Sequence, residues 1–196
     1  RDLMSHGAVL LPGVFSAISA KAAAKAGAEG LYLSGAGVTN SLLAVPDIAL
    51  LTMDEMARQA AYVVQASGLP VIADADTGYG DVWNVARTVI EFERAGLAGL
   101  HLEDQVSPKR CGHLDGKAVI PAVEMAAKLL AAIDARRNPN FLLIARTDAR
   151  GVEGLDGAIV RAPLVLACAR VALCALAAGA ASGWLAHRGA IDLGVV

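Results

Sequence analysis

Short apolar runs alternate along the chain with longer segments in which apolar residues recur every three or four positions. The short runs predict buried strands at residues 9–11, 30–33, 71–74, 99–103 and 141–145. The periodic segments predict helices at residues 17–26, 52–66, 84–95 and 121–136. Thr52-Met53-Asp54-Glu55 is typical of a helix start, and Gly68 and Pro70 end that helix. Strands and helices therefore alternate strictly.

Strands that are apolar on both faces and joined by helices are typical of a parallel sheet covered by helices. Open doubly wound sheets and (β/α)8 barrels share this pattern, and both place ligand sites at the carboxyl ends of the strands. The first two loops have no GxGxxG motif, and GxxxxGK[ST] occurs nowhere, so nothing supports nucleotide binding. We predict an α/β fold of the (β/α)8 TIM-barrel type. A full barrel needs eight units and about 250 residues, so we expect about the first five β/α units and an incomplete barrel.

The pattern changes after residue 162. Residues 163–196 are mostly Ala, Leu, Val and Gly, whereas the earlier helices carry Glu, Lys and Arg at regular intervals. We therefore divide the chain into a barrel segment at 1–162 and an apolar, Ala-rich tail at 163–196. A membrane helix is disfavoured, because Arg170 would cost roughly 2.5–3.5 kcal/mol near the bilayer centre. A foreign or out-of-frame segment, or an unusually apolar helix, fits this composition better.

Composition narrows the expected partners. The 196 residues are 56% hydrophobic, which is enough for one core, and the net charge is -2. That charge gives no electrostatic reason to expect nucleic acid or an anionic membrane, so a small molecule is the expected partner. Cys111, Cys168 and Cys174 lack zinc-ligand spacing, and no secretory signal follows Arg1, so we expect a cytoplasmic protein. The missing initiator Met suggests a fragment.

Carboxylates follow two neighbouring strands. Asp74 and Asp76 end the third predicted strand, and Glu103 ends the fourth. Because alternate residues of a strand point to the same side, the two aspartates could offer oxygen ligands at one point, and Glu103 could hold a water there. Such a set suits Mg²⁺ or Mn²⁺. The alternative is that Asp76-Thr77-Gly78 forms a turn and Glu103 caps a helix.

The segment Lys109-Arg110-Cys111-Gly112-His113 holds the catalytic candidates. Lys109 and Arg110 could bind substrate carboxylates. Cys111 could act as a proton donor or nucleophile, with His113 as its hydrogen-bond partner. The Asp-Gly pair at 115–116 predicts a tight turn, so we interpret the segment as a lid. Neighbouring cations favour the thiolate, whereas a general acid must keep its proton, and a surface thiol in a basic loop is the alternative.

Other polar positions allow two interpretations each. Arg146, at the end of the fifth strand, could bind a carboxylate bidentately or form a salt bridge at the rim. Ser34, with the amides around Gly35 and Ala36, could bind an anion or belong to a flexible glycine turn. Asp47 could face the site or start a turn. His101 is expected to be a core histidine.

Together these positions form a recognisable pattern. The segments that carry it, in order, are residues 32–37, 46–47, 74–78, 101–105, 109–113 and 145–149. They closely resemble the isocitrate lyase and phosphoenolpyruvate mutase superfamily, most closely its methylisocitrate lyase and dimethylmalate lyase branch. The resemblance covers about residues 7–162, and the Lys-Arg-Cys-Gly-His segment is highly specific for the lyases. Oxaloacetate decarboxylases and phosphonomutases of the superfamily share the aspartate pair but generally lack that segment.

The resemblance implies a Mg²⁺-dependent carbon–carbon lyase that cleaves a 2-hydroxy tricarboxylate, such as 2-methylisocitrate to pyruvate and succinate. A metal ion on Asp74 and Asp76 would stabilise the enolate of the departing 2-oxo acid, and Cys111 would protonate the second product. The resemblance also implies catalytic positions at Lys109, Arg110 and His113, with His113 supporting the thiol. Asp47 and Glu103 correspond to the metal's outer shell. Substrate-binding positions are implied at Ser34, Gly35, Ala36, Asp47, Gly112 and Arg146.

Superfamily members continue through further strands, which supply another catalytic glutamate, carboxylate-binding residues and helices for oligomer packing. We therefore expect this chain to be inactive and poorly stable by itself, and a homotetramer only for a full-length chain. Two alternatives stay open. The chain could be a non-catalytic fragment of such a lyase, or a member acting on another 2-hydroxy or 2-oxo acid, as dimethylmalate lyases, oxaloacetate decarboxylases and phosphonomutases do.

Overall fold

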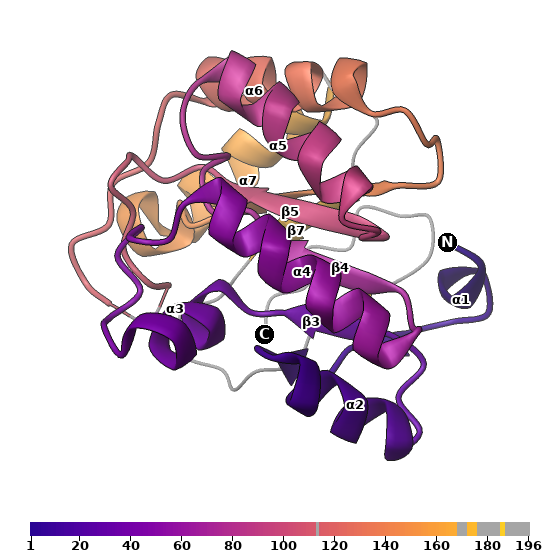
Figure 1. Ribbon diagram of the computed structural model, residues 1–196. Helices are drawn as coiled ribbons and strands as arrows, with labels where there is room; N and C mark the ends of the chain where they lie inside the picture. Colours follow the sequence, from indigo (N-terminus) through magenta and orange to yellow (C-terminus); the bar gives the residue numbers. More distant parts are fainter. Residues whose placement is uncertain (113, 168–171, 176–184, 187–196) are drawn as a thin grey trace.

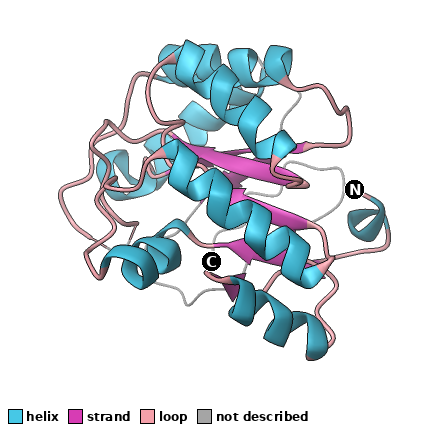
Figure 2. Ribbon diagram, viewed as in Figure 1, coloured by secondary structure: helices cyan, strands magenta, loops and turns pink. Residues whose placement is uncertain are grey.

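The computed structural model describes residues 1–112, 114–167, 172–175 and 185–186. Its centre is a parallel sheet of six strands in chain order (Figures 1 and 2). The strands are β2 (Gly13–Val14), β3 (Leu31–Leu33), β4 (Val71–Asp74), β5 (Gly99–Glu103), β6 (Leu142–Thr147) and β7 (Ala172–Ala175). Among the described residues, β2 and β7 are the two edges, so the sheet is not closed. The predicted α/β, barrel-type fold with an incomplete barrel is confirmed, and β7 adds a sixth strand.

Helices connect the strands. They are the short α1 (Asp2–Ser5), then α2 (Ala17–Lys25), α3 (Gly35–Leu43), α4 (Met53–Ser67), α5 (Val82–Arg94), α6 (Ala122–Ala135) and α7 (Arg150–Ala167). Figure 1 shows α4, α5 and α6 lying across one face of the sheet. The predicted start of α4 is confirmed, because Thr52 and Glu55 form a reciprocal capping box.

The core lies between the sheet and these helices. All five residues of β5 are buried, and Leu100 and Leu102 pack in the same cluster as Phe92 of α5 and Leu129 of α6. Burial of each such side chain contributes roughly 1.5–3 kcal/mol relative to exposure. The packed core fixes the strands, and the strands fix the polar residues at their carboxyl ends.

The first predicted strand forms, but it lies outside the parallel sheet. Val9–Leu10 forms β1, which pairs antiparallel with β8 (Leu185–Ala186), outside the parallel sheet. The first parallel strand lies beyond Pro12, at β2, where Gly13 and Val14 pair with β3. The apolar run continues on both sides of Pro12, so the sequence pattern could not tell which side joins the sheet.

The glycine-rich segment after β3 is not a flexible loop but the start of α3. Ser34 is the N-cap, and its Oγ accepts a hydrogen bond from the N–H of Gly37 at 3.1 Å. Glycine costs about 1 kcal/mol relative to alanine in a helix interior, so propensity hides this helix. The cap and the packing of Val38, which is fully buried, fix it instead.

Helix α7 runs across the boundary expected after residue 162. Its backbone is non-helical at Gly154, where φ is 79°, and Pro163 lies inside it. Strand β7, from the expected tail, pairs parallel with β6. The division into two segments stays a prediction. In the part of the chain that the structure describes, no helix has the length and apolar character needed to cross a membrane.

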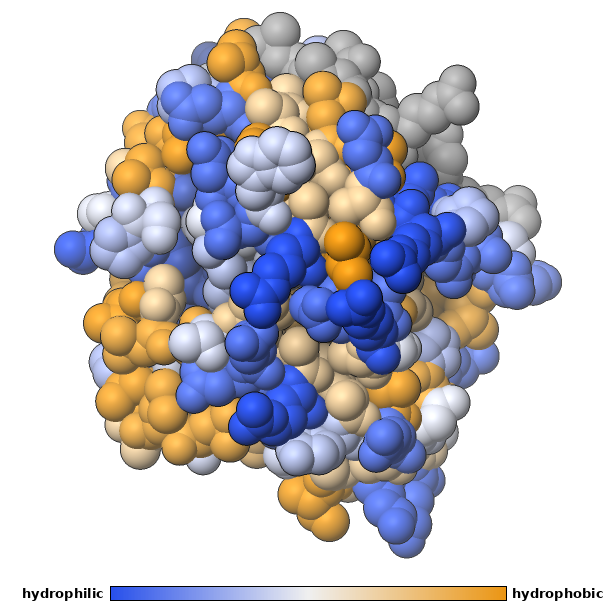
Figure 3. Space-filling view, turned by 45° about the horizontal axis from the view of Figure 1, so that its top comes forward, coloured by the Kyte–Doolittle hydropathy of each residue, from blue (hydrophilic) through white to orange (hydrophobic). Residues whose placement is uncertain are grey.

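Large apolar side chains also lie on the surface. Trp83 is 85% exposed, Ile18 76% and Val123 75%. Figure 3 shows apolar patches next to hydrophilic side chains over one face of the molecule. These three side chains lie on α5, α2 and α6.

Candidate active site at the carboxyl ends of the strands

Asp74, Glu103 and Arg146 lie at the ends of three neighbouring strands. Asp74 of β4 pairs in register with His101 of β5, and Glu103 of β5 pairs with Arg146 of β6. The loops that follow these strands, and α3, gather at the left edge of the view in Figure 1. This edge is where a parallel α/β fold places its ligands, and it brings together the carboxylates that the sequence singled out.

Asp76 reaches the site through a turn, not through strand alternation. Strand β4 ends at Asp74, and Asp76 has a left-handed φ of 46°. Asp74 Oδ1 accepts a hydrogen bond from the N–H of Asp76 at 2.9 Å, and Gly78 N–H donates to the carbonyl of Ala75 at 2.8 Å. The alternation argument for these two aspartates was therefore wrong. The turn interpretation is right, and the turn still brings both carboxylates into one buried cluster.

Lys109 is a buried cation inside this cluster. Its Nζ lies 2.7 Å from Asp76 Oδ1 and 2.7 Å from Asp47 Oδ2, and the residue is 2% exposed. Burial would lower the pKa of Lys109, but the surrounding carboxylates, led by Asp74 and Asp76, outweigh burial and raise it well above its usual value. Lys109 thus ties Asp47, which the sequence left open, to the site.

Arg146 forms a second buried group with two carboxylates. Its Nη1 lies 2.8 Å from Glu103 Oε2, and its Nη2 lies 3.1 Å from Asp148 Oδ2. Burial would lower the pKa of Arg146, but Glu103 and Asp148 raise it above the usual value. The salt bridge considered for Arg146 exists, but it is buried at the strand ends and not at the rim.

The cluster holds more negative groups than its cations neutralise. Burial, and then the charge of Asp74, raise the pKa of Asp76 to about 7. Burial raises the pKa of Glu103 to about 8, against the opposing effect of Arg146. Burial would also raise the pKa of Asp74, but His101, Lys109 and Arg146 outweigh it and lower that pKa to about 2. A divalent cation would relieve this excess of negative charge.

Two carboxylate oxygens fit a hydrated Mg²⁺ or Mn²⁺. Asp74 Oδ2 faces Gly35, where an added Cβ would lie only 2.7 Å away, and Glu103 Oε1 is buried without a hydrogen-bond partner among the described residues. Within the same residues, no three His, Cys, Asp or Glu side chains converge enough to hold a metal ion by themselves. A metal that takes one or two carboxylates and fills its shell with water, as Mg²⁺ does, needs no such group of three.

The loop between β5 and α6 covers the cluster. Gln105 holds it, donating from Nε2 to the Arg110 carbonyl at 2.9 Å and accepting the Arg110 N–H at 3.0 Å. An added Cβ on Gly112 would lie 2.8 Å from Arg146 Nη2, so this part of the loop rests on the guanidinium. Cys111 is half-buried beside it. Predicted His113 lies outside the described residues.

Arg110 points away from the carboxylates, unlike its neighbour Lys109. Its side chain is exposed, and its Nη1 donates to the carbonyl of Asp115 at 3.1 Å. Arg110 therefore holds the backbone at Asp115, where the structure has a bend, and the tight turn expected at the Asp-Gly pair stays a prediction. The structure does not bring its guanidinium to the strand ends.

Several residues of the site were missed from the sequence. Tyr32 Oη lies 2.7 Å from His101 Nε2, and burial lowers the pKa of His101 to about 4, so the imidazole is neutral. The expected core histidine is thus buried, but it also lies 3.6 Å from Asp74 Oδ1. Lys117 donates to the Gly112 carbonyl at 2.5 Å. Tyr32 and His101 lie within the recognisable segments, which was a usable signal, whereas Lys117 lies outside them.

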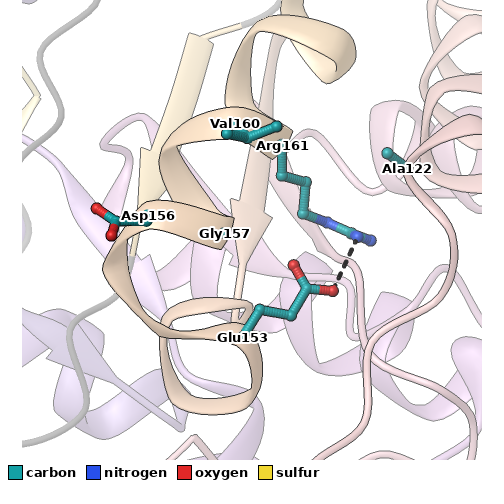
Figure 4. Close-up of a pocket in the computed structure, with 6 residues that line it drawn as sticks. All are labelled: Ala122, Glu153, Asp156, Gly157, Val160 and Arg161. Atoms are coloured by element: carbon teal, nitrogen blue, oxygen red, sulfur yellow. Dashed lines mark ion pairs between the residues drawn. The ribbon is translucent and has the colours of Figure 1, made fainter.

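Another cavity, of about 390 Å³, lies away from these residues, between the start of α6 and α7 (Figure 4). Arg161 is the cation in its lining, and its donors are already used: Nε lies 2.8 Å from Asp104 Oδ2, and Nη1 lies 3.7 Å from Glu153 Oε1. A site with a satisfied guanidinium offers little for a charged ligand. The strand ends are the better candidate.

A family model described as phosphoenolpyruvate phosphomutase matches residues 1–181. The chain belongs to the phosphoenolpyruvate phosphomutase family. The family match extends past residue 162, where the sequence resemblance ended. Among curated relatives, a probable 2-methylisocitrate lyase of Corynebacterium glutamicum is 53% identical over 156 residues, which are 80% of this chain and 51% of the relative. The chain spans about half the length of the curated relatives it matches.

Similar solved structures agree with this assignment. A crystal structure of 2,3-dimethylmalate lyase matches with a TM-score of 0.83 and 34% identity, over 93% of this chain and 62% of that one. An oxaloacetate acetylhydrolase in complex with 3,3-difluorooxalacetate matches with a TM-score of 0.79 and 41% identity, over 84% and 57%. A phosphonopyruvate hydrolase complex with oxalate and Mg²⁺ matches with a TM-score of 0.77 and 28% identity, over 85% and 57%.

Proposed function

We propose that this chain carries the metal-binding part of the active site of a Mg²⁺-dependent carbon–carbon lyase. Its substrate would be a 2-hydroxy tricarboxylate, 2-methylisocitrate, and its products pyruvate and succinate. One observation carries the proposal: Glu103, whose buried Oε1 has no partner among the described residues, pairs with the buried Arg146, against which Gly112 of the cysteine-bearing loop packs. Arg146 also acts electrostatically on Asp74. The relative named a probable 2-methylisocitrate lyase supports the choice of substrate.

Mg²⁺ held by Asp74, with Asp76 and Glu103 acting through water, would supply positive charge against the negative charge that develops on the departing 2-oxo acid. Lys109 keeps Asp76 and Asp47 in place through its two ion pairs of 2.7 Å each. This role in orienting the carboxylates replaces the substrate contact first expected for Lys109.

Substrate carboxylates would bind between α3 and Arg146. Ser34 caps α3, and the amides that follow, at Gly35 and Ala36, belong to the first turn of a nine-residue helix beside Asp74. The N-terminus of a helix attracts anions because its first N–H groups have no partner within the helix. Arg146 carries a buried Nε without a hydrogen-bond partner in the described part of the chain, which is available to a carboxylate oxygen.

Cys111 would supply the proton for the second product. Gly112 rests on Arg146, so the residue before it lies close to the bound carboxylates. The Sγ–H bond breaks as a C–H bond forms at the carbanion next to the carboxylate, which yields succinate and leaves a thiolate. Solvent returns the proton after the products leave, with His113 as the proposed support for the thiol.

The test is whether the purified chain with Mg²⁺ releases pyruvate from racemic 2-methylisocitrate. Pyruvate is measured by a coupled reaction that oxidises NADH. The sequence predicts an inactive chain, so the proposal that the chain is itself catalytic requires release that EDTA abolishes. Cys111→Ser should lower kcat by about 10²–10⁴, the usual contribution of a general acid, and leave Mn²⁺ affinity unchanged. Absence of pyruvate from a chain that binds Mn²⁺ normally would contradict the catalytic proposal. Full turnover by Cys111→Ser would remove the thiol from its role.

A second candidate is carbon–carbon hydrolysis of oxaloacetate. The likeness to oxaloacetate acetylhydrolase at 41% identity favours it. The purified chain with Mg²⁺ is therefore also incubated with oxaloacetate, and the oxalate released is measured by chromatography. Oxalate release without pyruvate release from 2-methylisocitrate would favour this candidate over the lyase.

A further inference from the structure

Tyr79 lies in a constrained turn directly after Asp74 and Asp76. Its φ is 59°, in the left-handed region that bulky residues rarely adopt. Its ring packs edge-on against Phe92, with centroids 6.4 Å apart. Gly78 has no room for a side chain, because an added Cβ would lie 2.4 Å from Val85 Cγ2. The turn and the core therefore hold the Tyr79 ring in one place.

The hydroxyl of Tyr79 is a buried donor without an acceptor. Its Oη is inaccessible to solvent and has no hydrogen-bond partner among the described residues. The residue also lines a cavity of about 370 Å³ together with Asp76 and Thr77. A tyrosine hydroxyl is protonated at neutral pH, and leaving such a donor buried and unsatisfied destabilises the folded chain.

The surroundings of this hydroxyl are anionic. The carboxylates of Asp76, Asp74, Asp47 and Glu103 all act on it electrostatically. Asp47 and Asp76 are held by Lys109, and Glu103 by Arg146, so the protein itself ties up much of the acceptor capacity of the cluster. A ligand bound at the cluster would bring such an acceptor.

We propose that Tyr79 is a positioning residue whose hydroxyl donates a hydrogen bond to a water of a hydrated divalent cation bound at the carboxylates. This inference rests on the proposed function only in requiring that the metal binds. Mg²⁺ and Mn²⁺ keep several waters when few carboxylates hold them, and hydrogen bonds to such outer groups strengthen metal binding. The metal-loaded chain thereby satisfies the donor that the metal-free chain leaves orphaned.

The test compares Tyr79→Phe with Tyr62→Phe in the whole chain. Each change removes one hydroxyl, and Tyr62 lies on α4 with 52% of its surface exposed. Mn²⁺ affinity is measured without substrate from the electron paramagnetic resonance signal of free Mn²⁺, and thermal unfolding is recorded with and without Mn²⁺. For Tyr79→Phe we expect Kd to rise about 3- to 10-fold, as for loss of one hydrogen bond.

Tyr79→Phe should affect the Tm of the metal-free chain and the Mn²⁺-induced rise in Tm differently. The Tm of metal-free Tyr79→Phe should equal or exceed that of the wild type, because the orphaned donor is gone, while the rise in Tm on adding Mn²⁺ should be smaller. Tyr62→Phe should match the wild type in both measurements. If the hydroxyl of Tyr79 were purely structural, its removal in Tyr79→Phe would lower the Tm of the metal-free chain. That outcome would overturn the proposal.

Two failures remain distinguishable. If the wild type and Tyr79→Phe bind Mn²⁺ equally well, the proposed role of Tyr79 is overturned and the proposed lyase site is not affected. Wild-type chain that folds but does not bind Mn²⁺ overturns both.

Discussion

Glu103 and Asp104 are adjacent carboxylates at the end of β5, and the chain uses them differently. Both are fully buried, and each pairs with a buried arginine at 2.8 Å, Glu103 with Arg146 and Asp104 with Arg161. Their burial is alike, so the difference lies in what else each carboxylate contacts.

Both oxygens of Asp104 have hydrogen-bond partners, so this carboxylate is saturated. Its Oδ1 accepts the N–H of Asp148 at 2.9 Å, and its Oδ2 accepts from Thr147 Oγ1 at 2.6 Å as well as from Arg161. These bonds join β5, the end of β6 and α7. Glu103 by contrast leaves Oε1 without a partner in the described part of the chain, and burial raises its pKa to about 8. A saturated carboxylate stabilises the fold, and an unsaturated one is available to a ligand.

Breaking the saturated pair should have the largest effect. Asp104→Ala leaves the Arg161 guanidinium buried without its main partner, and loss of one member of a buried pair costs about 3–5 kcal/mol. Urea unfolding followed by circular dichroism measures the change. Asp134→Ala, at an exposed position of α6, is the control and should change stability by less than about 0.5 kcal/mol. Equal unfolding midpoints for the two variants would refute the structural role of Asp104.

Changing the unsaturated carboxylate should act on the metal instead. Glu103→Gln keeps the shape but removes the charge, and loss of such an outer-shell partner typically weakens metal binding about 10- to 100-fold. Mn²⁺ titration measures this effect, with Glu124→Gln on the exposed face of α6 as the control. Arg146 retains Asp148, so we expect a smaller stability loss than for Asp104→Ala. Unchanged Mn²⁺ affinity would place Glu103 with the structural carboxylates.

A smaller effect on Mn²⁺ affinity is expected from a side chain that crowds Asp74 Oδ2, the second carboxylate oxygen proposed to face the metal. Gly35→Ala would place a Cβ 2.7 Å from Asp74 Oδ2 and force that carboxylate to shift. The cost is about 1 kcal/mol, at the low end for overpacking, or about fivefold in Mn²⁺ Kd. Gly13→Ala is the matched control, because nothing lies within 4 Å of its added Cβ. If both variants bound Mn²⁺ equally, Asp74 Oδ2 would not be the metal-facing oxygen.

The sequence predicted the strands that the core fixes most firmly. Strands β4 and β5 were expected at residues 71–74 and 99–103, and the structure has the same bounds. Every residue of β5 is buried, and strands buried on both faces carry mostly apolar residues, so the sequence pattern predicts this strand well. Strand β2 was missed because only two residues pair, next to a proline, and α3 was missed because its glycines are poor helix formers.

The sequence could name the candidates for the site but not their contacts. Asp74 and Glu103 follow apolar runs, and the carboxyl ends of parallel strands share one edge, so their proximity could be predicted. The left-handed turn at Asp76 and the orphaned hydroxyl of Tyr79 depend on packing against residues distant in sequence. Neither leaves a periodic signal.

Lys109 and Arg110 separate what sequence and tertiary structure decided. The sequence by itself determined a parallel α/β fold, its family, and a cationic, cysteine-bearing loop after a strand that ends in carboxylates. It treated the two cations alike. The tertiary structure buries Lys109 against Asp47, 62 positions away, and leaves Arg110 on the surface. The physical reason is that a buried charge requires partners, and only the folded chain determines where those partners lie.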